Sequence, residues 1–471
     1  MKKFMAIALA TSLMATPTLF ASEYTGNSKV VTTGQTTSTD KDGNIIETTD
    51  SYDAYYGQDA DYDSLEFSFT NNGDGTITDN NTGLMWQEIP IDSKMTWSQA
   101  MEYCESLELA GYDDWRLPTA DELFSISDFS VGWPYIDVSF FIMPDSSTSS
   151  GPQNSGPQNG GPQNGGPQGG APQGIAPIDS EDGETPPPLD GEARPPVDGE
   201  ALPPADGEAL PPVDGEARPP ADGEARPPVD GEALPPVDGD TPPPPEGTGE
   251  SSISKDEGQF WSSNYYLVEA EGARSGVAFG VNHATGHIKA YIAESAPAMG
   301  KNVRAVRGDE YAANDLVDNG DGTITDLSTG LMWMADDIGE AVDWEDALKI
   351  AEAYEFAGYD DWRLPDVKEL QTVVDYSGYY PAIDPAYFTT TELEENEFYY
   401  YWTSTSAYFS PQDPTEYFAW YVAFGYAVDN AGNDSHGAGG VRFSQKHLES
   451  EAEGEGGDNI LNSVRLVRTV D

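Results

Sequence analysis

A stretch that occurs twice constrains the fold of this 471-residue chain more than any other feature. The first copy reads NGDGTITDNNTGLMW at 72–86 and continues with AGYDDWRLP at 110–118. The second copy reads NGDGTITDLSTGLMW at 319–333 and AGYDDWRLP at 357–365, at a constant offset of 247 residues. A repeat of this quality is a duplicated folded unit. The sequence therefore predicts two related domains and not one large domain.

The N-terminal region before the first copy divides into two segments. Residues 1–21 have the pattern of a secretory signal, with Lys2 and Lys3 before an apolar run and Ala21 as the last residue before cleavage. Residues 22–63 are rich in Thr, Ser, Gly, Asp and Tyr without a sustained apolar period, which predicts a mostly disordered spacer. No later stretch is apolar over enough residues to cross a membrane. We therefore expect an exported protein in the periplasm, at the cell surface or in the medium.

A low-complexity insert at 146–254 interrupts the first copy. It runs first in a five-residue period built on GPQNG and then in an eight-residue period such as GEARPPVD. Proline pairs favour polyproline II and Asp-Gly steps break it, so the insert is predicted to be a disordered, acidic spacer. Neither period supplies glycine at every third residue, which excludes collagen.

Matches on the far side of the insert define the domain boundaries. WSSNYYL from Trp261 matches WTSTSAYF from Trp402, VAFGV at 277–281 matches VAFGY at 422–426, and NVRAVRG at 302–308 matches SVRLVRT at 463–469. The first domain is therefore predicted within 64–311 as two pieces, 64–145 and 255–308. The second domain is predicted to span 312–471 without interruption.

Local patterns predict an α+β fold for each copy. Short β-type runs separated by NNGD and DNNTG indicate a β-meander. Two helices follow in each copy, because a capping residue and its partner three positions later precede an apolar stripe at helical spacing. These cap pairs are Thr96 with Gln99, Thr119 with Glu122, Asp343 with Asp346, and Asp366 with Glu369.

The formal net charge of −61 limits the partners. Both copies are acidic, so nucleic acid, anionic membranes and sulfated polysaccharides are disfavoured by repulsion. Multivalent cations or a saline medium suit such a chain. The one cysteine, Cys104, excludes an internal disulfide framework and is expected to be a small core residue on the apolar side of a helix.

The ordered set GDGTITDxxTGLMW, GYDDWRLP, a WTS-type strand and a terminal VRLVR resembles the Lcl C-terminal domain family. That family is named after a collagen-like bacterial surface adhesin. The resemblance implies two tandem C-type-lectin-like domains, related to sulfatase-modifying domains, in an envelope or extracellular setting. It also implies adhesion, which in the namesake acts through sulfated polysaccharides.

Two departures limit what the resemblance implies. The acidic charge argues against carrying over sulfated polysaccharide as the ligand. The enzymatic branch of the wider superfamily uses paired cysteines, and this chain has only Cys104, which aligns with Ala351 in the second copy. We therefore expect no formylglycine-type chemistry.

The NNGDGTITD blocks have two interpretations. Glycine at turn positions explains them as hairpin turns. The alternative is a structural cation such as Ca²⁺, although the spacing does not follow an EF-hand loop. The candidate metal ligands are Asp74, Asp79, Asp321 and Asp326.

The GYDDWRLP blocks predict a structural lock. Arg116 and Arg363 follow paired aspartates, and the planar guanidinium suits bidentate carboxylate pairing. We expect Asp114 and Arg116, and likewise Asp361 and Arg363, to hold each copy together. A ligand carboxylate on the arginine is the alternative.

Aromatic residues around the resumed strands are the candidate ligand site. Exposed Trp and Tyr rings can stack on sugars, whereas alternating aromatics in strands also form cores. The candidates are Trp261, Tyr265, Trp402, Tyr408, Trp420 and Tyr421. The expected function is a non-enzymatic binding or adhesion protein that contacts glycan or extracellular matrix, with homo-oligomerisation left open. The alternatives are a carboxylate-dependent polysaccharide hydrolase and an assembly protein that binds other chains.

Overall fold

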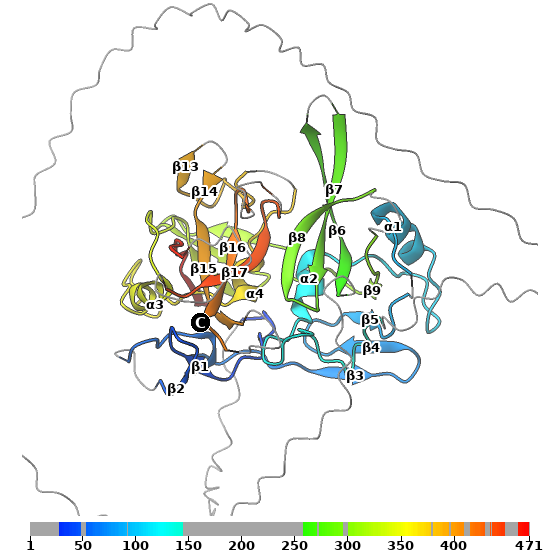
Figure 1. Ribbon diagram of the computed structural model, residues 1–471, viewed down its shortest axis with the longest axis horizontal. Helices are drawn as coiled ribbons and strands as arrows, with labels where there is room; N and C mark the ends of the chain where they lie inside the picture. Colours follow the sequence, from blue (N-terminus) through cyan, green and yellow to red (C-terminus); the bar gives the residue numbers. More distant parts are fainter. Residues whose placement is uncertain are drawn as a thin grey trace, which may run out of the picture. The chain divides into compact units, whose positions relative to one another are not determined.

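The computed structural model describes residues 28–48, 53–91, 93–144, 258–270, 273–294, 300–377, 380–394, 397–408, 415–428, 434, 436–447 and 460–470 (Figure 1). The predicted signal (1–21) and the predicted insert (146–254) lie outside the described residues. Within the described residues, no helix is long and apolar enough to span a bilayer.

Each copy builds a four-stranded antiparallel sheet, and the two sheets are equivalent. In both, a meander of three short strands is closed by a strand from the end of the copy. The strands are β3 (Phe69–Asn71), β4 (Thr76–Asp79), β5 (Met85–Gln87) and β9 (Val306–Arg307) in the first copy, and β10 (Leu316–Asp318), β11 (Thr323–Asp326), β12 (Leu331–Met334) and β18 (Val467–Thr469) in the second. Gly73 and Gly75 turn the first hairpin at φ values of 72° and 90°, which confirms the predicted turn.

The two predicted helices per copy are confirmed. They are α1 (Trp97–Glu105) and α2 (Ala120–Ser125) in the first copy, and α3 (Trp344–Glu352) and α4 (Val367–Gln371) in the second. Each begins at the predicted capping residue, whose side chain accepts from the backbone amide three positions later. Capping satisfies amides that would otherwise lack a partner, so these short helices start at a defined residue.

A six-stranded antiparallel sheet joins the two copies. Its order is β15-β16-β17-β8-β7-β6, with three strands from each copy (Figure 1). The strands are β6 (Gln259–Ala270), β7 (Ala273–Asn282) and β8 (His287–Ile292) from the first copy, and β15 (Tyr400–Ala407), β16 (Phe418–Ala423) and β17 (Gly440–Gln445) from the second. The described residues of both copies therefore belong to one compact unit.

The junction of this sheet has the register of a twofold-symmetric pair. Val441 of β17 lies opposite Ile288 of β8 in an antiparallel pairing. These two residues are also equivalent within their copies, because Ile288 pairs with Val281 and Val441 pairs with Val422. The copies thus meet as an isologous dimer does, within one chain.

The strand register corrects one sequence match. Trp261 pairs with Gly280, and Trp402 pairs with Tyr421, so Gly280 and Tyr421 are equivalent. The VAFG run of β7 is therefore equivalent to FAWY at 418–421 and not to VAFG at 422–425. The shared letters VAFG therefore gave an alignment of the two copies that is wrong by four residues.

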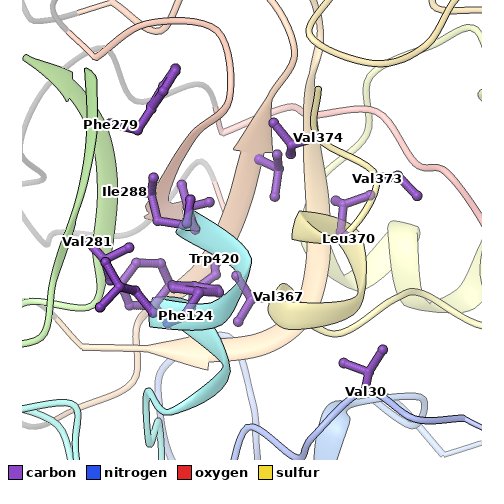
Figure 2. Packing of buried hydrophobic residues seen from close by; sticks show 14 of the residues in the cluster. Val30, Phe124, Phe279, Val281, Ile288, Val367, Leu370, Val373, Val374 and Trp420 are labelled. Carbon is purple, nitrogen blue, oxygen red and sulfur yellow. The ribbon is translucent and has the colours of Figure 1, made fainter. Parts of the chain in front are cut away.

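The core consists of one hydrophobic cluster shared by both copies and one further cluster within each copy. The shared cluster contains Phe124, Phe279 and Ile288 from the first copy together with Leu370 and Trp420 from the second (Figure 2). A second cluster, around Trp344 and Trp402, belongs almost entirely to the second copy. A third, around Trp115 and Trp261, belongs to the first.

The N-terminal segment corrects the prediction of a mostly disordered spacer at 22–63. Its described part carries β1 (Ser38–Thr39), β2 (Ile45–Ile46) and the 3₁₀ helix η1 (Asp59–Asp61). Val30, Val31 and Thr33 are buried against the two copies. The prediction was wrong because it required an apolar period for an ordered segment. This segment is held mainly by hydrogen bonds, which need no such period. Two further short strands, β13 (Glu392–Glu394) and β14 (Glu397–Phe398), form a hairpin in the second copy.

A fully buried arginine occupies the same place in each copy. Arg465 donates from Nη1 to the carbonyl oxygens of Met334 at 3.0 Å and Ala335 at 2.7 Å, and from Nη2 to that of Thr389 at 2.6 Å. Arg304 makes the equivalent three bonds in the first copy, and burial lowers the pKa of Arg304 to about 9. Each arginine ties the last carbonyl of a strand, in β12 or β5, and two loop carbonyls to the end of its copy.

Candidate binding cleft

Four of the six aromatic residues predicted to form a ligand site lie in the core and not on the surface. Trp261, Trp402, Trp420 and Tyr421 are all fully buried. The indole N–H groups of Trp261 and Trp402 donate to backbone carbonyls at 2.8 and 2.9 Å, and Tyr421 stacks on Tyr400 at 4.6 Å. These four residues are spread over three core clusters, so they cannot form one sugar-stacking platform.

The two remaining aromatic candidates are accessible but engaged and far apart in the sheet order. Tyr265 is 38% exposed, and its ring stacks on Trp97 at 4.5 Å. Tyr408 is half-buried and donates its hydroxyl to the carbonyl of Val131 at 3.1 Å. Neither faces the other, because Tyr265 lies on β6 at one edge of the sheet and Tyr408 follows β15 at the opposite edge.

The candidate metal ligands serve local turns. Asp74 accepts from the Thr76 hydroxyl at 2.6 Å, and Asp321 does the same for Thr323. Asp79 accepts from the amide of Asn81 at 2.9 Å, and Asp326 accepts from those of Ser328 and Asp315 at 2.9 and 3.0 Å. In the described part of the chain, no three His, Cys, Asp or Glu side chains are grouped to hold a metal ion.

Both predicted arginine locks are present, but each arginine pairs with a different carboxylate from the one predicted. Arg116 binds Glu122 of α2 through both carboxylate oxygens, at 2.6 and 2.5 Å, and Arg363 binds Glu369 of α4 in the same way. Asp114 and Asp361 instead pair with arginines near the end of each copy, Arg307 and Arg468, at 2.7 Å. The capping glutamates are the favoured partners because the amide of the N-cap residue holds their Oε2 atom at 2.9–3.0 Å, which presents the carboxylate to the arginine fork.

Cys104 is buried in α1, and desolvation raises the pKa of its thiol to about 12. Because the thiolate is the reactive form, we expect no labelling of the native protein by a thiol reagent at pH 8. Labelling should reach one thiol per chain in denaturant, which is the matched control. Rapid labelling without denaturant would contradict this assignment.

A cleft of about 540 Å³ lies where the two copies meet on the side of the interdomain linker. We call it the junction cleft. Its walls are Asp121 of α2, Asn264 of β6, linker residues 310 and 312–316, the 372–376 segment after α4, and a loop that includes Asp384 and Phe388. The side chain of Asn264 accepts from the Ala120 amide at 2.7 Å and so fixes the start of α2 against β6.

The junction cleft carries one sign of charge. Among the described residues, five carboxyl groups and no Lys, Arg or His line it: Asp121, Glu310, Asp315, Asp375 and Asp384. The Asp121 carboxyl accepts from the Gln371 side-chain amide at 3.1 Å, and desolvation, with Glu122 and Glu310 nearby, raises its pKa to about 8. A cleft of one sign concentrates ions of the opposite sign, so this cleft suits a cationic ligand.

Sequence reasoning missed this cleft because its walls come from five separated segments. One signal was present. Asp121 is the counterpart of Lys368, so the otherwise matched α2 and α4 differ by a charge reversal. Lys368 is buried, and its Nζ donates to the carbonyls of Thr32 and Ser125 at 2.7 and 2.8 Å.

Fold and site together define the class of this molecule: a pair of small, mainly β domains fused around one sheet, with a cleft at their junction. The family model of the Lcl C-terminal domain matches residues 75–160 and 322–443. The chain therefore carries two Lcl C-terminal domains, as its motifs indicated. No curated protein and no solved structure matches the chain significantly.

Proposed function

We propose that this protein is an exported, non-enzymatic binding protein of adhesion or matrix contact, and that the junction cleft is its ligand site. The observation that carries the proposal is the cleft of about 540 Å³, whose described lining residues include five carboxyl groups and no basic side chain. The C-type-lectin-like relationship and the extracellular setting belong to the same proposal and rest on the resemblance of the motifs.

The geometry changes the expected ligand class. Four of the six aromatic residues predicted to stack on a glycan are buried in the core, which removes support for that platform. An acidic polysaccharide would be repelled by a chain of net charge −61. A cationic group entering the cleft instead meets Asp375 and Asp384, each fixed by an amide two residues later at 2.9 Å.

Spermine is a suitable first probe, because it carries several positive charges and no other recognition chemistry. We expect it to bind the full-length protein in titration calorimetry at low salt, and to weaken as salt rises. The double variant Asp375→Asn and Asp384→Asn should bind about tenfold or more weakly, since it removes two charges from the cleft. The matched control is Asp128→Asn with Asp137→Asn, which changes the equivalent residues of the first copy.

Equal loss in both double variants would reduce the effect to general charge and would contradict the cleft as the site. Turnover of an envelope polysaccharide by the full-length protein, abolished by Asp121→Asn, would favour the hydrolase alternative. That alternative has one supporting feature, because the raised pKa of Asp121 keeps a proton available beside other carboxyl groups at neutral pH.

A further inference from the structure

The twofold relation between the copies gives the junction cleft a counterpart on the opposite side of the junction. In that counterpart, Lys368 occupies the position equivalent to Asp121. Leu65 is likewise equivalent to Ala312, and Phe129 to Tyr376. The equivalence holds in detail, because Thr405 accepts from the Val367 amide where Asn264 accepts from the Ala120 amide. The two sites are therefore built by the same elements.

The counterpart is not empty, and we call it the filled groove. Residues 29–35 of the N-terminal segment run through it, and Val31 pairs with Leu65 in a parallel bridge. The Thr32 amide donates to the Leu65 carbonyl at 2.9 Å, and the Phe129 amide donates to the Thr33 carbonyl at 2.7 Å. Gly34 passes close to Phe67 and Asp128, where a side chain would not fit.

The groups that hold residues 29–35 recur in the junction cleft. The carbonyl of Ala312 corresponds to that of Leu65, and the amide of Tyr376 corresponds to that of Phe129. Across the described residues, neither the Ala312 carbonyl nor the Tyr376 amide has a hydrogen-bond partner. By the equivalence of the two copies, a backbone donor and a backbone acceptor hold the places that Thr32 and Thr33 satisfy in the filled groove.

We propose that the junction cleft binds an extended peptide segment of another protein, and that this segment carries a lysine or arginine. The filled groove shows the binding mode, in which backbone hydrogen bonds give affinity as they do when a strand is added to an exposed edge. The carboxyl groups of Glu310, Asp315, Asp375 and Asp384, with no Lys, Arg or His among the described lining residues, select the basic side chain. This inference rests on the proposed function of the same cleft.

The test uses capped heptapeptides with the sequence of residues 29–35, KVVTTGQ, in which arginine replaces one residue at a time. We expect at least one of them to bind the full-length protein about tenfold more tightly than a version with Lys29 replaced by alanine and no arginine. N-methylation of the residue matching Thr32 removes the amide that would donate to Ala312, and should weaken that peptide about tenfold. N-methylation at the residue matching Thr33 is the control, because among the described residues that amide makes no hydrogen bond.

The outcomes separate the two proposals. If spermine binds but no peptide binds more tightly, or N-methylation has no effect, the extended-peptide inference is overturned and the cationic cleft stands. If neither spermine nor any peptide binds, both fail. If the protein forms a dimer that KVVTTGQ dissociates, the occupant is the N-terminal segment of a second copy and the proposed partner is wrong. Loss of peptide binding in the Asp375→Asn, Asp384→Asn variant, with retention in the Asp128→Asn, Asp137→Asn control, supports the inference.

Discussion

Replacing Trp420 by alanine is expected to lower the free energy of unfolding by about 3–5 kcal/mol, the usual cost of deleting a large buried ring. The centroid of the Trp420 ring lies 5.2 and 5.7 Å from those of Phe129 and Tyr135 in the first copy. It lies 5.2 Å from that of Phe443 in the second copy. The cavity would therefore open in the core that both copies share. Calorimetry should show one transition, shifted downward, and hydrogen exchange should rise in both copies.

The matched control for that experiment is Trp402→Ala. It removes the same ring from the cluster that belongs to the second copy. Local exchange should then rise first in the second copy. Two separate transitions, of which Trp420→Ala moves only one, would show that the copies unfold independently despite the joined sheet.

Replacing Arg465 by methionine is expected to cost about 3–5 kcal/mol, because each buried carbonyl that loses its donor costs about 1–3 kcal/mol. Methionine fills much of the space but leaves the carbonyls of Met334, Ala335 and Thr389 without their donor. Urea unfolding measures the loss. Arg304→Met should behave alike, since that side chain makes the equivalent bonds.

The surface control for Arg465→Met is Lys349→Met. Lys349 is exposed and pairs with Glu345 one helical turn away, a type of pair that contributes about 0.5 kcal/mol or less. Similar losses for Arg465→Met and Lys349→Met would show that the buried arginine contributes no more than an exposed ion pair.

Local features of the fold could be predicted because they depend on residues that are close together in the sequence. Thr96 and Thr119 mark their helix starts through contacts three residues away, and the glycines at 73 and 75 mark a turn. The joined sheet was not predictable in the same way. The pairing of Val441 with Ile288 links distant residues, and the apolar pattern of β17 is the same whether its neighbour lies within or outside its copy.

The error in the aromatic prediction has the same origin. Alternating aromatics such as those in FAWYVA are compatible with a strand that exposes one face and with a strand buried in a core. All of β16 is buried, because Trp420 and Val422 face the shared core while Tyr421 and Ala419 face the second copy's own cluster. A strand covered on both sides cannot be told from a half-exposed one by its period alone.

The isologous junction also fixes the valency of the molecule. A chain of two equivalent domains could offer two equivalent sites, yet here one is occupied by the chain's own residues 29–35 and the other is the junction cleft. Each chain is then monovalent for a ligand of the cleft. Firm attachment to a surface would have to come from many chains displayed together, whose avidity depends on their density and not on the affinity of one cleft.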